Sequence, residues 1–403
     1  MTKTKAHDLK TLGTKILGPK VSRRLQHVNS FHVMSLMAEA KRLDAQGNQV
    51  IHMEMGEPDF STPQPIIDAG IKSLQSGITH YTPTLGLPEL RKAIANFYLK
   101  EHRVTIDPEQ IIITPGSATA LQLVLNLMVA DGDSVVIPDP AYPSTHNLVR
   151  LLGGNVLQIA VTEESCWQLT VELLEEYWSD AINTVLVASP SNPTGTLLDD
   201  AQLQKIADFC ESKGVFLLVD EIYHGLVYGQ TPKTAVGLNN NTFVINSFSK
   251  FYGMTGWRVG WIVAPKTYLK EVNKLAQHTF LAAPTPSQYA ALAAFNDDTQ
   301  KILIERRDEF KARRDYLYDA LNELGFKIRV KPQGAFYIYA DCSAFCEDSY
   351  DFSCKVLQEN HVAFTPGIDF GVNEANQHVR FAYTTDIKNL EIGIQRLAEL
   401  DKV

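Results

Sequence analysis

The amino-acid sequence predicts an α/β protein built on a largely parallel sheet. From about residue 50 to residue 265, short apolar runs alternate with segments of helical periodicity. This alternation is typical of βαβ units, in which helices cover both faces of parallel strands. The side chains that could carry chemistry follow the apolar runs directly. We therefore expect a functional site at the carboxyl ends of the strands, where ligands bind in such folds.

The expected strands are short runs rich in valine, isoleucine and leucine, a composition that suits burial on both faces of a sheet. They lie at residues 50–55, 110–114, 134–138, 155–161, 184–189, 216–220, 242–247 and 260–264. Helices are expected between several of them, at residues 118–130, 144–152 and 199–213.

The pattern changes from about residue 298. Residues 302–324 have the periodicity of one long helix. We expect its arginine and lysine residues to form a solvated face rather than a nucleic-acid patch, because acidic residues lie among them. After this helix, the sequence predicts strands at 327–331 and 335–339, a helix at 351–359 and a strand at 378–383. These elements predict a second, smaller α/β unit.

Composition excludes some classes of protein. The chain has 403 residues, of which 45% are hydrophobic, and its net charge of -9 argues against a nucleic-acid partner. The five cysteines are odd in number and include no CxxC pair, so we expect reduced thiols in the cytoplasm and no metal site. No apolar stretch is long enough to cross a membrane. Residues 1–25 are expected to be a mobile tail.

Lys250 is the leading candidate for a reactive group. It follows an expected strand, with Ser247 before it and Arg258 after it. A lysine amine can condense with a carbonyl, and nearby positive charge lowers its pKa. Hydroxyls and an arginine can bind a phosphate. An amine beside a phosphate site suggests pyridoxal phosphate, although a lone lysine is more often an ordinary surface residue.

Other candidates also follow expected strands. Gly116 makes a turn into a helix, whose free N–H groups suit an anion, although a plain helix cap is an equal alternative. Asn192 lies in a turn with two nearby X-Pro bonds, which raises the chance of a cis peptide. Asp220 ends an apolar run and needs a partner such as a protonated pyridine nitrogen, unless it caps the next helix. Tyr142 could stack on a planar ring, and Tyr223 could reach a ring oxygen.

The order and spacing of these motifs resemble a known family. The segments GSATA, NPTG, DEIY, SFSKFYGMTGWRVG and HVRFAY occur in this order. They are similar to those of the class I and II aminotransferases of pyridoxal-phosphate fold type I, from about Phe31 to the C-terminus. The resemblance implies a large domain with a mostly parallel seven-stranded sheet flanked by helices, and a smaller α/β domain. We expect the large, cofactor-binding domain at residues 50–297 and the small domain at 26–49 and 298–403.

The resemblance also implies pyridoxal 5'-phosphate as the cofactor and assigns the residues around its ring. Lys250 would hold it as a covalent Schiff base and move the substrate proton. Asp220 would keep the ring nitrogen protonated. Tyr223 and Asn192 would bind the phenolic oxygen, and Tyr142 would stack on the ring.

Further residues are assigned to the phosphate and to the substrate. The phosphate would be held by Gly116, Ser117, Ala118, Ser247 and Arg258, and by Tyr81 reaching the partner subunit of a homodimer. The substrate carboxylate would be held by Arg380, Asn192 and the backbone of Gly56. The resemblance also suggests cis bonds at Asp139–Pro140 and Asn192–Pro193.

We expect an aminotransferase that passes the amino group of an L-amino acid to a 2-oxo acid such as 2-oxoglutarate. Phe31, Val33 and Tyr142 favour an amino acid with an apolar or aromatic side chain. The alternative is a C–S lyase or a related elimination or synthase enzyme, which uses the same residues but releases pyruvate and ammonia from one substrate. A non-catalytic sensor domain is a remote alternative, because fewer than 50 residues precede the first strand, too few for a DNA-binding module.

Overall fold

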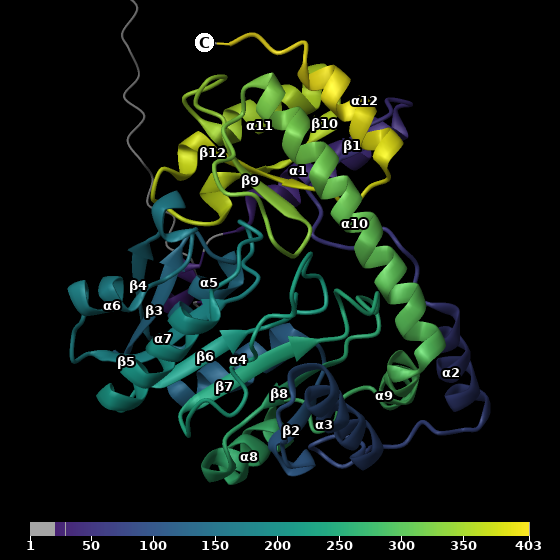
Figure 1. Cartoon of the computed structure of the whole chain (residues 1–403), viewed down its shortest axis with the longest axis vertical. Helices are drawn as coiled ribbons and strands as arrows, with labels where there is room; N and C mark the ends of the chain where they lie inside the picture. Colours follow the sequence, from purple (N-terminus) through teal and green to yellow (C-terminus); the bar gives the residue numbers. More distant parts are fainter. Residues whose placement is uncertain (1–20, 29, 403) are drawn as a thin grey trace, which may run out of the picture.

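The computed structural model describes residues 21–28 and 30–402, and its larger sheet has seven strands. Their order is β2-β8-β7-β6-β5-β3-β4 (Figure 1). The strands are β2 (Ile111–Thr114), β3 (Ser134–Asp139), β4 (Asn155–Ala160), β5 (Ile182–Ala188), β6 (Phe216–Asp220), β7 (Thr242–Ser247) and β8 (Gly260–Val263). Neighbours are parallel except at β8, which runs antiparallel to β2 and β7. The predicted mostly parallel seven-stranded sheet is confirmed. Residues 1–20 of the predicted tail lie outside the described residues.

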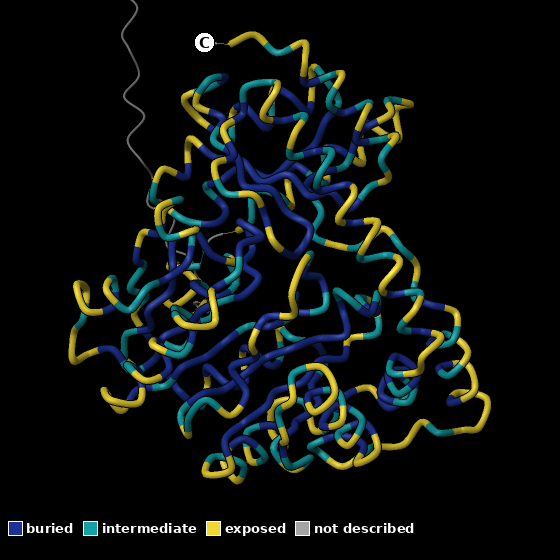
Figure 2. Tube along the Cα trace, in the orientation of Figure 1, coloured by how far each residue is buried: buried dark blue, intermediate teal, exposed yellow. Residues whose placement is uncertain are grey.

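Both faces of this sheet are covered, which explains the uninterrupted apolar runs. Along β6, Leu217 and Val219 join the core on one face, and Leu218 joins the core on the other. Helices α3 (Pro88–His102), α6 (Val171–Glu176), α7 (Asp200–Lys213) and α9 (Thr285–Leu292) pack on the first face. Helices α4 (Ser117–Met128), α5 (Pro143–Leu151) and α8 (Leu269–Thr279) pack on the second. Figure 2 shows the strands buried between these layers. The sheet with its helices is called the large lobe below.

The C-terminal elements form a second lobe. Its three-stranded sheet has the order β11 (Thr365–Pro366), β12 (His378–Ala382) and β9 (Tyr337–Asp341). A two-stranded sheet joins β1 (Ile51–His52) to β10 (Val362–Ala363). Helices α1 (His32–Ala45), α11 (Ser349–Asn360) and α12 (Ile387–Leu397) pack around them (Figure 1). This small lobe has its own aromatic core, which includes Phe336, Phe364 and Phe381.

Some predicted elements of the small lobe are wrong. The strand expected at 327–331 is reduced to one bridge between Lys327 and Asp341. The next strand begins two residues later than expected, at Tyr337, because Pro332, Gly334 and a left-handed Ala335 (φ 55) hold the chain in a loop. The first expected strand, at 50–55, shortens to β1 and pairs with the small lobe.

One helix, α10 (Asp297–Leu324), extends along both lobes (Figure 1). Arg313 is buried on it and binds Asp59 at 2.9 Å, while Arg306 donates to the Ser61 carbonyl at 2.7 Å. Arg314 is also buried and donates to the Pro332 carbonyl at 2.7 Å. The expected solvated basic face is therefore wrong for Arg313 and Arg314. Their guanidinium groups bind Asp59 and the Pro332 carbonyl, and so connect the helix to two loops instead of facing water.

Among residues 21–28 and 30–402, no helix combines the length and the apolar character needed to cross a membrane. All five cysteines lie in this part of the chain and are free thiols. The cis bonds at Asp139–Pro140 and Asn192–Pro193 are present, and Ser189–Pro190 is cis as well.

A histidine bridge joins α1 to β1 in the small lobe. Nδ1 of His52 lies 2.8 Å from Glu54 Oε1, and its Nε2 lies 2.8 Å from Asp44 Oδ2. The hydrogen bond with Glu54 raises the pKa of His52 to about 9, and Asp44 adds to this effect. The bridge is therefore strongest when the imidazole is protonated.

The pH dependence of stability tests this bridge. Folding raises the pKa of His52 from 6.5 to about 9, so its stabilisation is fully present below pH 6.5 and is lost as the pH rises through about 9. The ring is 35% exposed, so screening reduces the expected loss to about 1–2 kcal/mol. Between these pH limits, the urea-unfolding midpoint should fall further for the unmodified protein than for His52→Gln. Equal falls would contradict the prediction.

Candidate functional site

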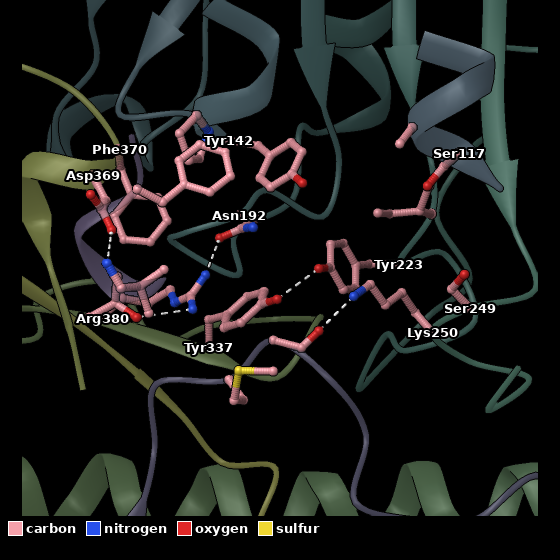
Figure 3. A pocket seen from close by; sticks show the side chains of 18 of the residues that line it. Ser117, Tyr142, Asn192, Tyr223, Ser249, Lys250, Tyr337, Asp369, Phe370 and Arg380 are labelled. Carbon is pink, nitrogen blue, oxygen red and sulfur yellow. Dashed lines mark hydrogen bonds between the residues drawn. The ribbon is translucent and has the colours of Figure 1, made fainter. Parts of the chain in front are cut away.

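A cavity of about 340 Å³ lies at the carboxyl ends of β5 and β6, where the small lobe faces the sheet (Figure 3). This volume is within the range of small-molecule sites. Most of the predicted site residues line it: Phe31, Gly56, Ser117, Ala118, Tyr142, Asn192, Asp220, Tyr223, Lys250, Arg258 and Arg380. Gly116, Ser247 and Tyr81 are not among its lining residues.

Lys250 follows β7 directly, and its amine points into this cavity. Its Nζ donates to the Gly56 carbonyl at 2.6 Å. Burial, followed by the positive charge of Arg380, lowers the pKa of Lys250 to about 8. An amine with this pKa is partly neutral near neutral pH, so it can act as a nucleophile or a base.

Asp220 ends β6 at the floor of the cavity. Its Oδ1 accepts the backbone N–H of Ile222 at 3.1 Å. Burial raises the pKa of Asp220 to about 6. Across the described ranges of the chain, Asp220 forms no ion pair. A carboxylate in this position can accept a hydrogen bond from a cationic ligand, which would relieve its desolvation.

Two tyrosines connect the lysine side of the cavity to the arginine side. The hydroxyl groups of Tyr223 and Tyr337 lie 2.8 Å apart, and both rings are buried. Nζ of Lys250 lies 5.9 Å from the centre of the Tyr223 ring. The guanidinium of Arg380 lies 4.3 Å from the centre of the Tyr337 ring. Figure 3 shows these four side chains in a row across the cavity.

Arg380 comes from β12, and its charge is balanced by no carboxylate within the described part of the chain. Its Nη1 donates to Asn192 Oδ1 at 2.9 Å, and its Nη2 donates to the Glu54 carbonyl at 2.7 Å and to Thr365 Oγ1 at 3.2 Å. Its Nε has no hydrogen-bond partner. The side chain is only 6% exposed. A guanidinium held by neutral acceptors beside a cavity is suited to bind a carboxylate ligand.

A turn into α4 provides a second place for an anion. Gly116 is the N-cap with φ 84, and no side chain caps the helix, so N–H groups of its first turn remain available. A Cβ at this position would lie 2.5 Å from Nη2 of Arg258, so the guanidinium would have to shift away from the turn if Gly116 carried a side chain. Ser117 lines the cavity at the same turn. Ser247 is buried, and its hydroxyl donates to the Val259 carbonyl at 3.3 Å. Ser249, two residues later, lines the cavity.

Three predicted aromatic residues lie at different depths. Phe31 is the N-cap of α1 and lines the cavity. Tyr142 precedes α5 at the cavity rim and is 39% exposed. Tyr81 is 83% exposed and lies outside the cavity.

Several lining residues were missed in the sequence analysis: Tyr337, Thr365, Asp369, Phe370 and Ser249. Phe370 covers the face of Arg380 at 4.8 Å from its ring centre. The sequence held one usable signal, since Asp369 and Phe370 follow Gly367, and glycine is typical of turns. Nothing in the local pattern could show that this turn faces β12.

The assembled groups fit the cofactor that the sequence resemblance implies. Lys250 offers an amine for an aldehyde, and Asp220 offers a carboxylate without a cationic partner for a ring nitrogen. The turn at Gly116 with Arg258 offers an anion site for a phosphate. Arg380 remains for a second anion, the carboxylate of a substrate.

Comparisons with known proteins agree with this site. The family described as aminotransferase class I and II matches residues 48–397. The chain is 39% identical to a (5-formylfuran-3-yl)methyl phosphate transaminase of Methanocaldococcus jannaschii, over 94% of this chain and 99% of that protein. It is 35% identical to a probable aspartate/prephenate aminotransferase of Aquifex aeolicus, over 94% and 97%. An aminotransferase structure from Mycobacterium tuberculosis superposes with a TM-score of 0.91 at 33% identity, over 94% and 98%.

The acidity of Lys250 can be measured directly. We expect its modification by acetic anhydride to follow a pKa of about 8, below the ordinary 10.5. Arg380→Met should raise that pKa, because it removes a nearby positive charge. Mass spectrometry of the Lys250 peptide measures the rate of its acetylation. The rate at the exposed Lys266 serves as the reference for the reactivity of the reagent. Arg306→Met, outside the cavity, is the matched control. An unchanged pKa in Arg380→Met would show that the positive charge of Arg380 is not a cause of the lowered pKa.

Proposed function

Since the chain belongs to the class I and II aminotransferase family, we propose that its amino donor is an L-amino acid with an apolar or aromatic side chain. Membership of the family makes the chain an aminotransferase and implies pyridoxal phosphate as its cofactor. For the acceptor we propose a 2-oxo acid such as 2-oxoglutarate. The observation that carries the proposal is the group of apolar residues at the start of α1, which lines the same cavity as Arg380 and Lys250.

The residues that would hold the cofactor are those predicted from the sequence. Lys250 would bind it covalently through Nζ, and Asp220 would accept the proton of its ring nitrogen. When bound, the cofactor supplies an electron sink for negative charge at the substrate Cα. Tyr223 and Asn192 would bind its phenolic oxygen, and Tyr142 would stack on its ring. Its phosphate would be held by Gly116, Ser117, Ala118, Ser247 and Arg258.

Lys250 would also move the substrate proton. Its lowered pKa leaves part of the amine neutral near neutral pH, so Nζ can accept a proton from the substrate Cα and return it. The Gly56 carbonyl, 2.6 Å away, gives the amine a defined position when it is free. Positive charge at Arg380 favours the neutral amine, so the same arginine would support both substrate binding and proton transfer.

Arg380 would hold the α-carboxylate of the substrate, with help from Asn192 and the backbone of Gly56. The rest of the cavity decides the side-chain preference. Its wall on the N-terminal side is formed by Phe31, Val33, Met34 and Met37, which we call the side-chain wall. These residues are apolar, and none offers a cation for an acidic side chain. The two relatives named above differ in the substrates that their names give, so the residues of this chain carry the proposal.

The remaining expectations are proposals as well. We propose a homodimer, supported by the exposure of Tyr81, and a cytoplasmic location, supported by the five free thiols. We also keep the division into a large domain at 50–297 and a small domain at 26–49 and 298–403. Support comes from the different hydrophobic clusters to which most core residues of the two lobes belong, with Tyr223 and Leu226 of the large lobe packing in the small-lobe cluster.

An absorption spectrum tests the proposed function. With pyridoxal phosphate added, the protein should show a visible band that Lys250→Ala lacks while its circular dichroism stays unchanged. Phenylalanine, tyrosine, leucine or alanine should remove the band, and 2-oxoglutarate should restore it. Lys250→Ala should lower the transamination rate by about 10³-fold or more, because it removes the base.

Three results would contradict parts of this proposal. Equal or better turnover of aspartate would contradict the apolar preference. A persistent band with accumulating ammonia and pyruvate would indicate elimination. Absence of any band in the unmodified protein would contradict the role of Lys250.

The homodimer has its own test. Sedimentation should find two chains per particle, and Tyr81→Phe should weaken cofactor retention by about tenfold, the effect of one lost hydrogen bond to a charged phosphate. Tyr177→Phe is the control, because this tyrosine is also exposed and is given no role in cofactor binding. A monomer with full activity and cofactor affinity would refute the prediction.

A further inference from the structure

The helix that carries the side-chain wall has no capping residue of its own. Its N-cap is Phe31, which provides no side-chain hydrogen bond. The carboxylate of Asp369, far along the chain, takes over this function. It accepts the backbone N–H of His32 and of Val33, each at 2.8 Å. Nδ1 of His32 lies 2.7 Å from the same carboxylate. One buried acid thus binds three N–H groups of the first turn of α1.

The first turn of α1 has few other attachments. The buried residues of α1 are Leu36, Ala40 and Leu43, which pack with Leu357 and Ala363 beyond that turn. The turn itself, with Phe31, His32, Val33 and Met34, contains no buried residue. One ring contact, at 4.9 Å between His32 and Tyr350, adds to the bonds with Asp369. Asp369 therefore supplies most of the fixed contacts that the structure shows for this turn.

Asp369 is itself on a segment bound to the large lobe. The next residue, Phe370, covers Arg380 and accepts the backbone N–H of Ala141 at 2.8 Å. The buried carboxylate of Asp139, at the end of β3, accepts the N–H groups of Val372 at 3.0 Å and of Asn373 at 3.2 Å. The position of Asp369 is thus fixed relative to the sheet that ends at the cavity. These bonds to the large lobe make Asp369 a rigid support for the side-chain wall.

A second cavity lies on the other side of the first turn. It measures about 110 Å³ and shares Phe31, Pro143 and Asp369 with the main cavity. Its remaining lining is largely polar and includes His146, Asn147, Arg150 and Gln158. Phe31 and Asp369 therefore border both the cavity that carries the apolar side-chain wall and this polar one.

We propose that Asp369 is a positioning residue for substrate specificity. By holding His32 and Val33, it keeps the side-chain wall against the apolar or aromatic side chain of the amino donor and separates that side chain from the polar cavity. The inference rests on the proposed function, because it concerns the same substrate. The physical reason is that a carboxylate at a helix N-terminus makes charge-assisted hydrogen bonds and interacts favourably with the helix dipole. A wall that is fixed before binding costs less ordering entropy when the substrate arrives.

The test compares Asp369→Asn with a matched control in the cofactor-loaded protein. An asparagine has one acceptor oxygen for three N–H groups, so at least one bond to the first turn is lost. Asp199→Asn is the control, because Asp199 caps α7 through two N–H groups at 2.9 Å and lines neither cavity. Amide hydrogen exchange of residues 32–34 is measured without substrate, and KM and kcat are measured for phenylalanine and alanine.

In Asp369→Asn, we expect exchange at residues 32–34 to become about tenfold faster or more, as the loss of a hydrogen bond to a charged group implies. KM for phenylalanine should rise by about tenfold, while KM for alanine, whose side chain does not reach the wall, should change by less than about twofold. The visible band should remain. Asp199→Asn should change none of these quantities.

Two outcomes would overturn the inference: unchanged exchange at residues 32–34 in Asp369→Asn, or an equal rise in KM for both amino acids. If Asp369→Asn does not fold, His32→Leu removes the side-chain bond and the ring contact with Tyr350 but leaves both backbone bonds to Asp369, and it should give the same pattern with smaller effects. The absence of this pattern would overturn the inference as well. Failure of the proposed function is distinguishable, because it would appear as a missing band or missing transamination in the unmodified protein, whereas the exchange measurement needs neither.

Discussion

The buried guanidinium of Arg380 is the constraint on which the rest of the site depends. A buried charge is costly unless its donors are satisfied, and this one is held by an amide, a carbonyl and a hydroxyl instead of a carboxylate. The rings of Tyr337 and Phe370 cover it at 4.3 and 4.8 Å. The charge therefore remains available to a ligand, and it also lowers the pKa of Lys250. One residue of the small lobe thereby adds to the effect of burial on the pKa of a lysine in the large lobe.

The two lobes contribute different parts of the cavity. The large lobe provides Asp220, Lys250 and the turn at Gly116, all at strand ends. The small lobe provides Arg380 and the side-chain wall. Hydrogen bonds between the lobes include the bond from Lys250 to the Gly56 carbonyl and the bonds from Asp139 to the segment after Phe370. Apolar contacts join the lobes as well, because Tyr223 and Leu226, which follow β6, pack in the core of the small lobe.

The local pattern of apolar residues was sufficient to predict the strands of the large lobe. Both faces of its sheet are buried, so each strand is a nearly continuous apolar run. The same pattern predicted the strands of the small lobe less well, because β1, β10 and β11 have only two residues each. It also failed for Arg313 and Arg314, whose charges looked solvated but are buried against partners from distant loops. Burial of an arginine is decided by acceptors that come from elsewhere in the chain, and helical periodicity carries no information about them.

The sequence by itself determined the fold class, the strand ends that carry Lys250 and Asp220, and the family, because motif order and spacing are local properties of the chain. Only the tertiary structure decided which groups meet. It placed Tyr337 between Arg380 and Tyr223, and it brought Asp369 to the bare N-terminus of α1. The contacts of Tyr337 with Tyr223 and of Asp369 with His32 join residues more than a hundred positions apart in the chain. Their formation depends on how the two lobes pack, which no single segment encodes.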